Sequence, residues 1–394
     1  MGDLNDYILK CDICGREYSP NKAINLCSCG YPPLVKLNLS KLKDKIDRNK
    51  HTNWGQGMWQ FFELLPLQDP RNRVTIGEGG TPLLHLSKLG REFGLSKLYV
   101  KIEGYNPTGT FKARGASMCV SKVLDLGLKD VVIHSAGSAA VAAATYGAKA
   151  GIRVHVFIPE NAPRIAIDEC RMLGAELSLV PGGIVAAHQT ASEVMEHEGW
   201  YSVSASEEPY RFEGKKTMAY EMAQQLNWVL PDVVIQPTGG GIGLVAMEKG
   251  FRELHELGWV DGILPRMVAA QSEGCAPVYE AWSQMLSECR EWGDATSPAP
   301  GLLVPSVLAD RLVLNAIQRS RGFAVAVQDP DVFRTMQLAA KLEGLLIGPE
   351  SAIALHASRQ ALLKGLVDND EVIVVVLTSA SLRFPKLLTS VLGS

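Results

Sequence analysis

Short aliphatic runs alternate with longer amphipathic or alanine-rich stretches from about residue 95 onward. Such runs are typical of strands buried on both faces, and the stretches between them have the length of helices. The runs predict strands at 97–103, 130–135, 153–159, 232–237, 266–272 and 371–379. Two of the stretches predict helices, at 139–151 and 215–228. This alternation predicts an α/β protein with parallel sheets that carry helices on both faces.

The size of the chain predicts more than one domain. It has 394 residues, of which 46% are hydrophobic, enough for two or three domains. We expect an N-terminal segment at 1–38 and a body at 39–394. Within the body, a small subdomain at roughly 115–215 is expected to be inserted in a large subdomain formed by 75–114 and 216–394. The polar stretch at 40–75 is expected to connect the N-terminal segment to the body.

Charge and hydropathy exclude several classes of protein. The net charge of −3 provides no basic field for nucleic acid or an anionic membrane. The aliphatic run at 372–377 is far shorter than the ~20 residues of a membrane span, and the N-terminus has no apolar signal-peptide core. Eight cysteines in a chain of this length do not form a disulfide scaffold. We expect a soluble, cytoplasmic protein with reduced thiols.

Half of the cysteines lie close together near the N-terminus, at Cys11, Cys14, Cys27 and Cys29. A Cys-x-x-Cys-Gly sequence followed by a second close pair has zinc-ribbon spacing, although the second pair is the tighter Cys-x-Cys. Four thiolates close a tetrahedral site and leave no open position, so the expected Zn²⁺ is structural. The alternative is a ribbon that has lost its metal and kept its shape.

Four polar or glycine-rich turns follow predicted strands. They are "NPTGTFKARG" (106–115), "SAGS" (135–138), "PTGGGIGL" (237–244) and "LTSAS" (377–381). Active sites of open parallel sheets lie at the carboxyl ends of the strands. Four such turns at strand ends therefore favour a functional site.

The glycine-rich turn predicts a phosphate site. Gly239, Gly240, Gly241 and Gly243, with Ile242 between them, allow the main chain to bend around an anion at the start of a helix. The turn is neither a Walker loop nor a dinucleotide fingerprint, because Leu244 stands where the last glycine of the fingerprint would be.

A phosphate cradle together with a lysine at a strand-end turn favours pyridoxal 5'-phosphate, which binds through its phosphate and through an imine to a lysine amine. The lysine of the first turn is Lys112. Its alternative interpretation is a solvated lysine at the start of a helix.

The ordered set of motifs resembles threonine synthase and its close relatives, which are fold type II pyridoxal-phosphate enzymes. The resemblance covers essentially the whole chain. Its motifs are "GMWQFFELLP", "TIGEGGTPLL", "NPTGTFKARG", "SAGSAA", "EPYRFEGKKT", "PTGGGIGL" and "LTSASLRFP", besides the N-terminal ribbon. The resemblance implies an enzyme that acts on a small amino acid with a leaving group at the β or γ carbon. We also expect a homodimer.

The resemblance assigns roles to individual residues. Lys112 is expected to form the Schiff base and to move protons, in a turn shaped by Asn106 and Pro107. The loop from Gly239 to Gly243 is expected to hold the cofactor phosphate, and Thr378 to face the pyridine nitrogen. The remaining expected contacts to the cofactor ring or the substrate are Ser135, Ala136, Gly137, Ser138, Glu208 and Arg211.

The chain departs from the family pattern at three places. Ser138 stands where the family usually has Asn, and "TSASLR" replaces Thr-Gly-His-Gly-Leu-Lys. Glu208 stands near the expected substrate phosphate, where the family tends to have Asn. We predict that phosphohomoserine, the default substrate, is a poor one unless Glu208 points away. The alternatives are β-elimination or β-replacement on serine, threonine or phosphoserine, and a cofactor-binding relative with weak catalysis used in regulation.

Two further polar residues are expected to be structural. His134 ends a predicted strand and is expected to be packed, although it could act as a base. Glu78 is expected to be a turn residue in "GEGGTP".

Overall fold

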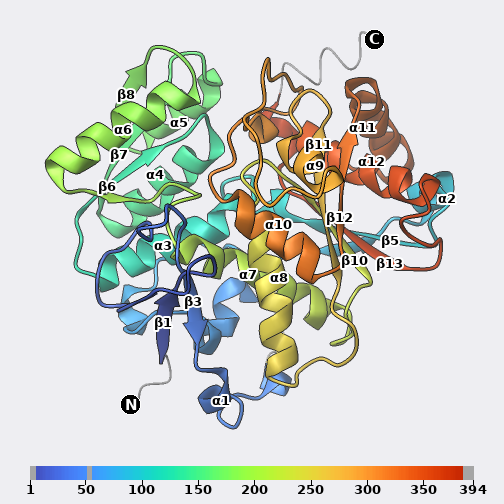
Figure 1. Cartoon of the computed structure of the whole chain (residues 1–394), viewed down its shortest axis with the longest axis horizontal. Coiled ribbons are helices and arrows are strands. Elements are labelled where there is room, and N and C mark those ends of the chain that lie inside the picture. The colour runs from blue at the N-terminus through green and yellow to red at the C-terminus, as the bar shows by residue number, and fades with distance from the viewer. Residues whose placement is uncertain (1–5, 51–55, 385–394) are drawn as a thin grey trace. The chain divides into compact units, whose positions relative to one another are not determined.

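The computed structural model describes residues 6–50 and 56–384, which form two compact units. The first unit comprises 6–47, 56–78 and 112–217, and the second comprises 48–50, 79–111 and 218–384. Residues 51–55 of the expected connecting arm lie outside the described residues. Figure 1 labels the helices and strands of both units.

The first unit contains a parallel sheet with the strand order β8-β7-β6-β9. Its strands are β6 (Asp130–His134), β7 (Arg153–Pro159), β8 (Glu176–Val180) and β9 (Tyr201–Ser202). The helices of the unit are α1 (Leu39–Leu42), α3 (Lys112–Asp125), α4 (Ser138–Ala150), α5 (Arg164–Met172), α6 (Ile184–Glu198) and the first part of α7 (Tyr210–Gln225). The unit also has two 3₁₀ segments, η3 (Met58–Leu64) and η4 (Pro70–Asn72).

Each central strand of this sheet is buried on both faces, which explains its continuous apolar sequence. In β6, Val131 and Ile133 pack with residues of α3 and α4, whereas Val132 between them packs with Ala187 and Ala191 of α6. Successive side chains of a strand point to opposite faces, so a strand with helices on both sides needs apolar residues at every position.

The N-terminal cysteine segment forms an antiparallel sheet, β2-β1-β3. Its strands are β1 (Tyr7–Lys10), β2 (Glu17–Tyr18) and β3 (Leu34–Leu37). The buried side chains of Tyr7 and Leu9 pack against Met118 of α3 and Tyr210 of α7. The sheet therefore has an apolar face of its own within the first unit.

The second unit contains a six-stranded sheet with the order β12-β11-β10-β13-β5-β4. Its strands are β4 (Leu83–His85), β5 (Lys97–Ile102), β10 (Val233–Pro237), β11 (Arg266–Ser272), β12 (Phe323–Val327) and β13 (Val372–Leu377). The other elements are η1 (Arg48–Lys50), α2 (Ser87–Phe93), η5 (Glu103–Tyr105), the end of α7, α8 (Ile242–Glu256), α9 (Pro277–Ser283), η6 (Pro300–Leu302), α10 (Asp310–Arg319), α11 (Asp329–Glu343), α12 (Pro349–Leu363) and η7 (Ser381–Arg383).

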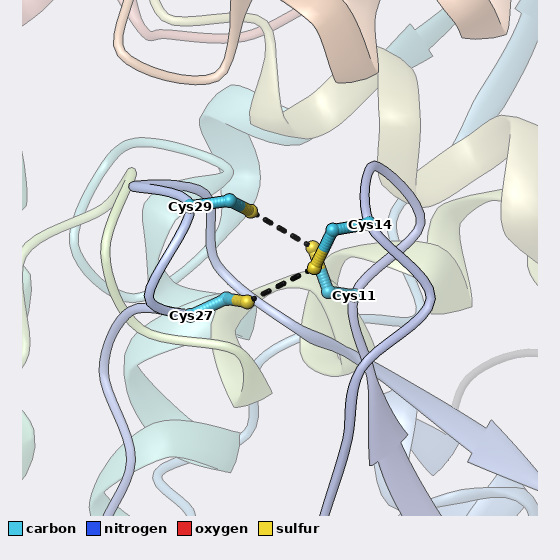
Figure 2. A group of neighbouring side chains, drawn as sticks. All are labelled: Cys11, Cys14, Cys27 and Cys29. Atoms are coloured by element: carbon cyan, nitrogen blue, oxygen red, sulfur yellow. Dashed lines mark hydrogen bonds between the residues drawn. The ribbon is translucent and has the colours of Figure 1, made fainter.

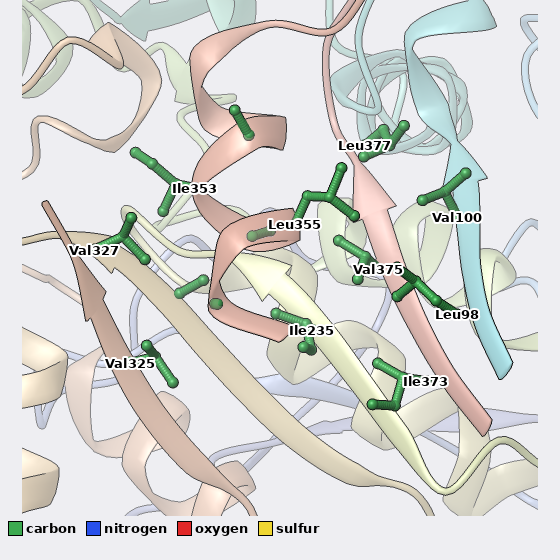
Figure 3. Packing of buried hydrophobic residues seen from close by; sticks show 14 of the residues in the cluster. Leu98, Val100, Ile235, Val325, Val327, Ile353, Leu355, Ile373, Val375 and Leu377 are labelled. Atoms are coloured by element: carbon green, nitrogen blue, oxygen red, sulfur yellow. The ribbon is translucent and has the colours of Figure 1, made fainter. Parts of the chain in front are cut away.

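The main core of the second unit lies where α12 crosses the sheet. Figure 3 shows Ile353 and Leu355 of α12 above Ile235 of β10 and Val375 of β13. All four side chains are fully buried. Burying an aliphatic side chain of this size stabilises the fold by about 1.5–3 kcal/mol, so this contact fixes the middle of the sheet.

The structure confirms the predicted α/β class and each predicted strand, with ends that differ by at most two residues. Within the six-stranded sheet, the edge strand β4 runs antiparallel to β5, whereas the other pairs are parallel. Of the helices in the described part of the chain, none is both long and apolar enough to cross a membrane.

Candidate active site

Three of the predicted strand-end turns meet at one edge of the sheet in the second unit. β10, β13 and β5 are consecutive parallel strands, so the glycine-rich loop, Thr378 and the turn at 106–111 all follow the same edge. The Phe111 N–H donates to the Thr378 carbonyl over 3.1 Å, and the Ala380 N–H donates to the Gly109 carbonyl over 3.0 Å. Lys112 follows Phe111 directly in the chain.

Asn106 organises this turn. Its side-chain amide donates to the carbonyl and to the carboxylate of Glu103, each over 2.8 Å, and its Oδ1 accepts from the Gly79 N–H over 2.9 Å. Its main-chain carbonyl accepts from the Gly109 N–H over 2.7 Å. A single buried residue therefore holds the strand end and the loop before Lys112 in a fixed shape.

The glycine-rich loop is a cradle that a side chain would fill. Gly241 has φ +74°, and a Cβ there would lie 2.1 Å from Val313 Cγ2. At Gly239, a Cβ would lie 2.8 Å from the carbonyl oxygen of Gly301. Helix α8 begins after Gly241 without a side-chain cap. The first N–H groups of a helix have no intrahelical partner and attract anions, so this loop fits a phosphate group.

Lys112 and Ser138 lie together in the first unit. Lys112 begins α3, Ser138 begins α4, and Lys112 Nζ lies 3.1 Å from Ser138 Oγ. The turn between β6 and α4 is tied by the Gly137 N–H, which donates to Ser135 Oγ over 3.2 Å. Helix α4 also begins without a side-chain cap. The structure thus brings the predicted lysine to a second helix start that can bind an anion.

Two motif glycines let α3 and α7 approach closely. A Cβ on Gly214 would lie 2.0 Å from the Arg114 carbonyl oxygen. A Cβ on Gly115 would lie 3.1 Å from both the Arg211 carbonyl oxygen and Lys215 Cε. This packing carries Arg211 and Lys215, one helical turn apart on α7, to the side of α3.

Arg211 is fully buried, and none of its three guanidinium nitrogens has a hydrogen-bond partner among the described residues. Lys215 is also buried, and the pKa of its amine is well below the usual range because of burial and the nearby charges of Arg211 and Lys112. A buried cation normally has an anionic partner. The group of Arg211, Lys215 and Lys112 therefore has the charge of an anion site.

Glu208 caps the start of α7. Its carboxylate accepts from the Arg211 main-chain N–H over 2.7 Å and from the Tyr201 hydroxyl over 2.9 Å. Burial raises the pKa of this carboxyl group, although the Tyr201 hydroxyl and the Arg211 charge oppose the shift. Both carboxylate oxygens are thus engaged by the helix start and by β9.

Glu78 is more than a turn residue. Its buried carboxylate accepts from Trp59 Nε1 and Ser117 Oγ on one oxygen, and from the Tyr146 hydroxyl and the Ile76 N–H on the other. These neutral donors connect η3, α3 and α4. The sequence showed an acidic residue in "GEGGTP", but it could not show its hydrogen-bond donors, because most of them are far away in the sequence.

The four N-terminal cysteines converge between two loops (Figure 2). Cys11 Sγ lies 3.4 Å from Cys29 Sγ, and Cys14 Sγ lies 3.3 Å from Cys27 Sγ. All four sulfur atoms lie within 4.8 Å of one another. Zn–S bonds of about 2.3 Å place the sulfurs of a tetrahedral site about 3.8 Å apart, so a small outward movement would admit the ion.

Sequence reasoning missed Lys215 and the partners of His134. Lys215 is one of two adjacent lysines in "GKKT", and only the helical spacing from Arg211 could have singled it out. His134 lies beside His188 of α6 and Glu207, which follows β9. Burial lowers the pKa of His134 to about 4.

Comparison with known proteins supports this interpretation of the motifs. A family model described as "Pyridoxal-phosphate dependent enzyme" matches residues 74–379. The chain is 35% identical to the threonine synthase of Methanosarcina acetivorans over 98% of this chain and 94% of that protein. It is 32% identical to the threonine synthase of Methanocaldococcus jannaschii over 95% and 93%. The solved structure of maize serine racemase superposes with a TM-score of 0.67 at 21% identity, over 79% and 92% of the two chains.

Proposed function

The chain belongs to the family of pyridoxal-phosphate dependent enzymes, and on this premise we propose that it removes a phosphate leaving group from the side chain of a small amino acid. It has the type II fold, uses pyridoxal 5'-phosphate and is a threonine synthase-like carbon–oxygen lyase. Within that class, phosphohomoserine is the proposed substrate and threonine the proposed product.

The residues at the strand ends fit the cofactor. The uncapped start of α8 and its glycine cradle suit the phosphate, and we assign that role to the loop from Gly239 to Gly243. We assign the covalent bond to the Lys112 amine, the contact to the pyridine nitrogen to the Thr378 hydroxyl, and a contact to the ring to Ser138. When bound, the cofactor supplies an electron sink for carbanion chemistry. Between steps, the Lys112 amine holds and returns a proton.

The substrate carboxylate is assigned to the turn at Ser135, Ala136 and Gly137. The N–H groups at the start of α4 have no side-chain cap, and they suit a carboxylate as well as they suit a phosphate. The hydroxyl of Ser135, a residue that is 9% exposed, already accepts from the Gly137 N–H. This bond fixes the shape of the turn.

The observation that carries the proposal is the buried guanidinium of Arg211 without a hydrogen-bond partner among the described residues. A planar guanidinium binds phosphate through two parallel hydrogen bonds, and the amine of Lys215 lies one turn along α7. A leaving group that carries two negative charges would satisfy the Arg211 guanidinium. A neutral hydroxyl would leave this positive charge uncompensated.

Glu208 does not overturn this assignment. Its carboxylate is held by the Tyr201 hydroxyl and by the start of α7, where a negative charge is favourable. The alternative is β-elimination or β-replacement on serine, threonine or phosphoserine, and the negative charge of Glu208 near Arg211 is the feature that favours it. The second alternative, a regulatory relative with weak catalysis, requires negligible turnover of every amino acid tested.

The test compares kcat/KM for phosphohomoserine, phosphoserine, serine and threonine in the wild type and in Arg211→Met. Methionine has a similar volume and suits a buried position, so the variant should fold. We expect kcat/KM to fall about 10²–10³-fold for the preferred phosphorylated substrate, because about 3–4 kcal/mol of charge-assisted hydrogen bonding is lost. For serine, kcat/KM should change little.

Arg171→Met is the matched control, because Arg171 lies on the exposed side of α5 beside Asp168. An equal loss for all four substrates in Arg211→Met would make Arg211 a structural residue. A wild type that prefers serine or threonine would select the elimination alternative. Turnover near background for all four would select the regulatory one.

We also propose that Cys11, Cys14, Cys27 and Cys29 bind one structural Zn²⁺. Four thiols from two loops, with sulfur atoms 3.3–3.4 Å apart in two pairs, match a closed thiolate site. Elemental analysis should find one Zn²⁺ that is lost in Cys14→Ser. Metal-free protein that keeps its full thermal stability would contradict this role.

The homodimer and the cytoplasmic location remain proposals. None of the eight cysteines, all of which lie among the described residues, forms a disulfide, and this supports a reducing compartment. Sedimentation equilibrium and fractionation of the source cells test them.

A further inference from the structure

A second group of metal-binding side chains lies in the first unit, away from the cysteines in sequence and in ligand type. His134 ends β6, His188 lies on the second turn of α6, and Glu207 follows β9. Each offers one ligand atom, and these atoms all lie within 4.8 Å of one another. His188 Nε2 lies 3.2 Å from Glu207 Oε1, and His134 Nδ1 lies 4.0 Å from the same oxygen.

These distances suit a tetrahedral ion. With metal–ligand bonds of about 2.0–2.1 Å, neighbouring ligand atoms of a tetrahedral zinc site lie about 3.3 Å apart. The pair of His188 and Glu207 already has this spacing, and His134 Nδ1, at 4.0 Å from Glu207 Oε1, has to move closer to that oxygen. The two imidazole rings are tilted by 57° with centroids 4.5 Å apart, so they are not simply stacked on each other.

The surroundings of the group resemble the outer shell of a metal site. The Ser202 hydroxyl donates to Glu207 Oε2, the oxygen that does not face the histidines. Ser204 Oγ lies 3.0 Å from His134 Nδ1, the nitrogen that faces Glu207, so this hydrogen bond has to give way when an ion binds that nitrogen. Hydrogen bonds to metal ligands orient them and tune their basicity.

A small cavity lies beside the group. Its lining includes His134, Glu207, Ser202 and Ser204, and its volume of about 10 Å³ is close to what one water molecule needs. An ion held by three side chains keeps one open position, and this cavity provides a place for a water molecule there.

We propose that His134, His188 and Glu207 bind one divalent transition-metal cation of the zinc type. Two imidazoles and one carboxylate select such ions over Mg²⁺ and Ca²⁺, which prefer oxygen ligands. The ion connects the end of β6, helix α6 and the segment after β9. His134 is followed directly by the turn at 135–138, and Glu207 by Glu208, so the ion positions two segments of the substrate side of the site.

The experiment measures bound Zn²⁺ by elemental analysis in the holoenzyme after dialysis against micromolar Zn²⁺ and removal of the free ion. Wild type is compared with His188→Ala and Glu207→Gln. The side chain of His188 is 38% exposed, so its removal should not unfold the protein. His197→Ala is the matched control, because His197 lies on the same helix, is exposed and contacts Glu198.

We expect the wild type and His197→Ala to contain one more Zn²⁺ per chain than His188→Ala and Glu207→Gln. Any ion bound by the cysteines is common to all four proteins and does not affect this difference. We also expect Zn²⁺ to raise the unfolding temperature of the wild type by several degrees more than that of His188→Ala. Equal zinc content in wild type and His188→Ala overturns the proposal. A difference that appears only at millimolar Zn²⁺ overturns it as well.

Discussion

Two helix starts, one in each unit, are built for anions in different ways. Helix α8 follows the glycine-rich loop and helix α4 follows the serine turn, and neither has a side-chain cap. Around α8 the space is closed by main chain and by Val313, so that a Cβ at Gly241 has no room. Around α4 the surroundings are side chains, with Lys112 beside Ser138.

This difference decides which of the two anion sites a substitution of a side chain can alter. A site made of main-chain N–H groups has the same chemistry whatever the side chains are, provided that glycine keeps the loop open. A site made of side chains can be retuned by single substitutions. We therefore expect the second unit to fix the cofactor phosphate and the first unit to decide the substrate.

The largest effect is expected for Lys112, which belongs to the cofactor rather than to the substrate part of the first unit. Lys112→Ala should lower kcat/KM by about 10⁴-fold or more, because no other group supplies the covalent bond and the proton. Borohydride reduction and peptide mapping of the wild type should place the pyridoxyl label on Lys112. Lys149→Ala, an exposed change on α4, is the control.

Recovery of the label on Lys101, Lys122 or Lys216 would contradict the assignment. All three are buried, so they are the lysines whose labelling would be informative.

The second largest effect tests the main-chain site. Gly241→Ala forces an alanine into φ +74° with its Cβ 2.1 Å from Val313 Cγ2, so the loop must move. Displacing the phosphate from charge-assisted N–H bonds worth about 2–3 kcal/mol should raise the cofactor dissociation constant by about 10²-fold. Cofactor titration followed by visible absorbance measures it.

Gly183→Ala is the matched control for that change. Gly183 also precedes a helix, α6, but it has φ −96°, and a Cβ added there would have nothing within 4 Å of it. The substitution should leave cofactor affinity unchanged. If both substitutions weaken cofactor binding equally, the effect at Gly241 comes from a change in helix propensity and not from the lack of room for a Cβ.

The sequence predicted the parts of the molecule that depend on local pattern. Strands β5, β6, β7, β10, β11 and β13 were visible because burial on two faces requires apolar residues at every position, as in Val131, Val132 and Ile133. Strand β12 was not predicted, although its sequence is equally apolar. The turns at strand ends were visible because glycine and serine are concentrated there. Short or half-exposed strands such as β8 and β9 were missed, since their apolar runs are too brief.

Contacts between distant segments were not predictable. Glu208 has the sequence context of a substrate contact, yet its carboxylate bonds to Tyr201 and to the start of its own helix. The group of His134, His188 and Glu207 is assembled from a strand end, a helix and a loop. No periodicity links such residues, so only the packed structure reveals them.

A smaller effect tests whether charge on α7 decides the substrate. The pKa of Lys215 is lowered, so its positive charge is lost as pH rises through a value below the usual lysine range. On this alkaline limb of the pH profile, kcat/KM for phosphohomoserine should fall about tenfold as pH rises. This is the effect expected from the loss of one charge-assisted hydrogen bond. Lys215→Met should lack the limb, and serine should not show it in the wild type.

The same limb with serine as substrate, or its persistence in Lys215→Met, would assign the titration to another group. In either case Lys215 would not belong to the anion site.

The smallest effect concerns Glu208. At about 4 Å, a carboxylate could oppose a substrate phosphate by roughly 4 kcal/mol at an effective dielectric of ~20, or about 10³-fold in affinity. The structure predicts much less. The Tyr201 hydroxyl and the positive end of α7 already offset the charge of the carboxylate, and its raised pKa reduces its ionised fraction. Glu208→Gln should lower KM for phosphohomoserine by only about three- to fivefold, with kcat unchanged.

The pH dependence of this gain has a definite sign. The folded pKa of Glu208 is raised, so the wild-type carboxyl is neutral below that pKa and resembles glutamine there. The advantage of Glu208→Gln should therefore appear above the folded pKa and disappear as pH falls through it. The cap is weakened by the change, and the unfolding free energy should fall by about 1 kcal/mol, measured by urea denaturation. A KM that is equal in both proteins at all pH values would mean that Glu208 acts as a helix cap alone, and that substrate choice in the first unit rests on Arg211 and Lys215.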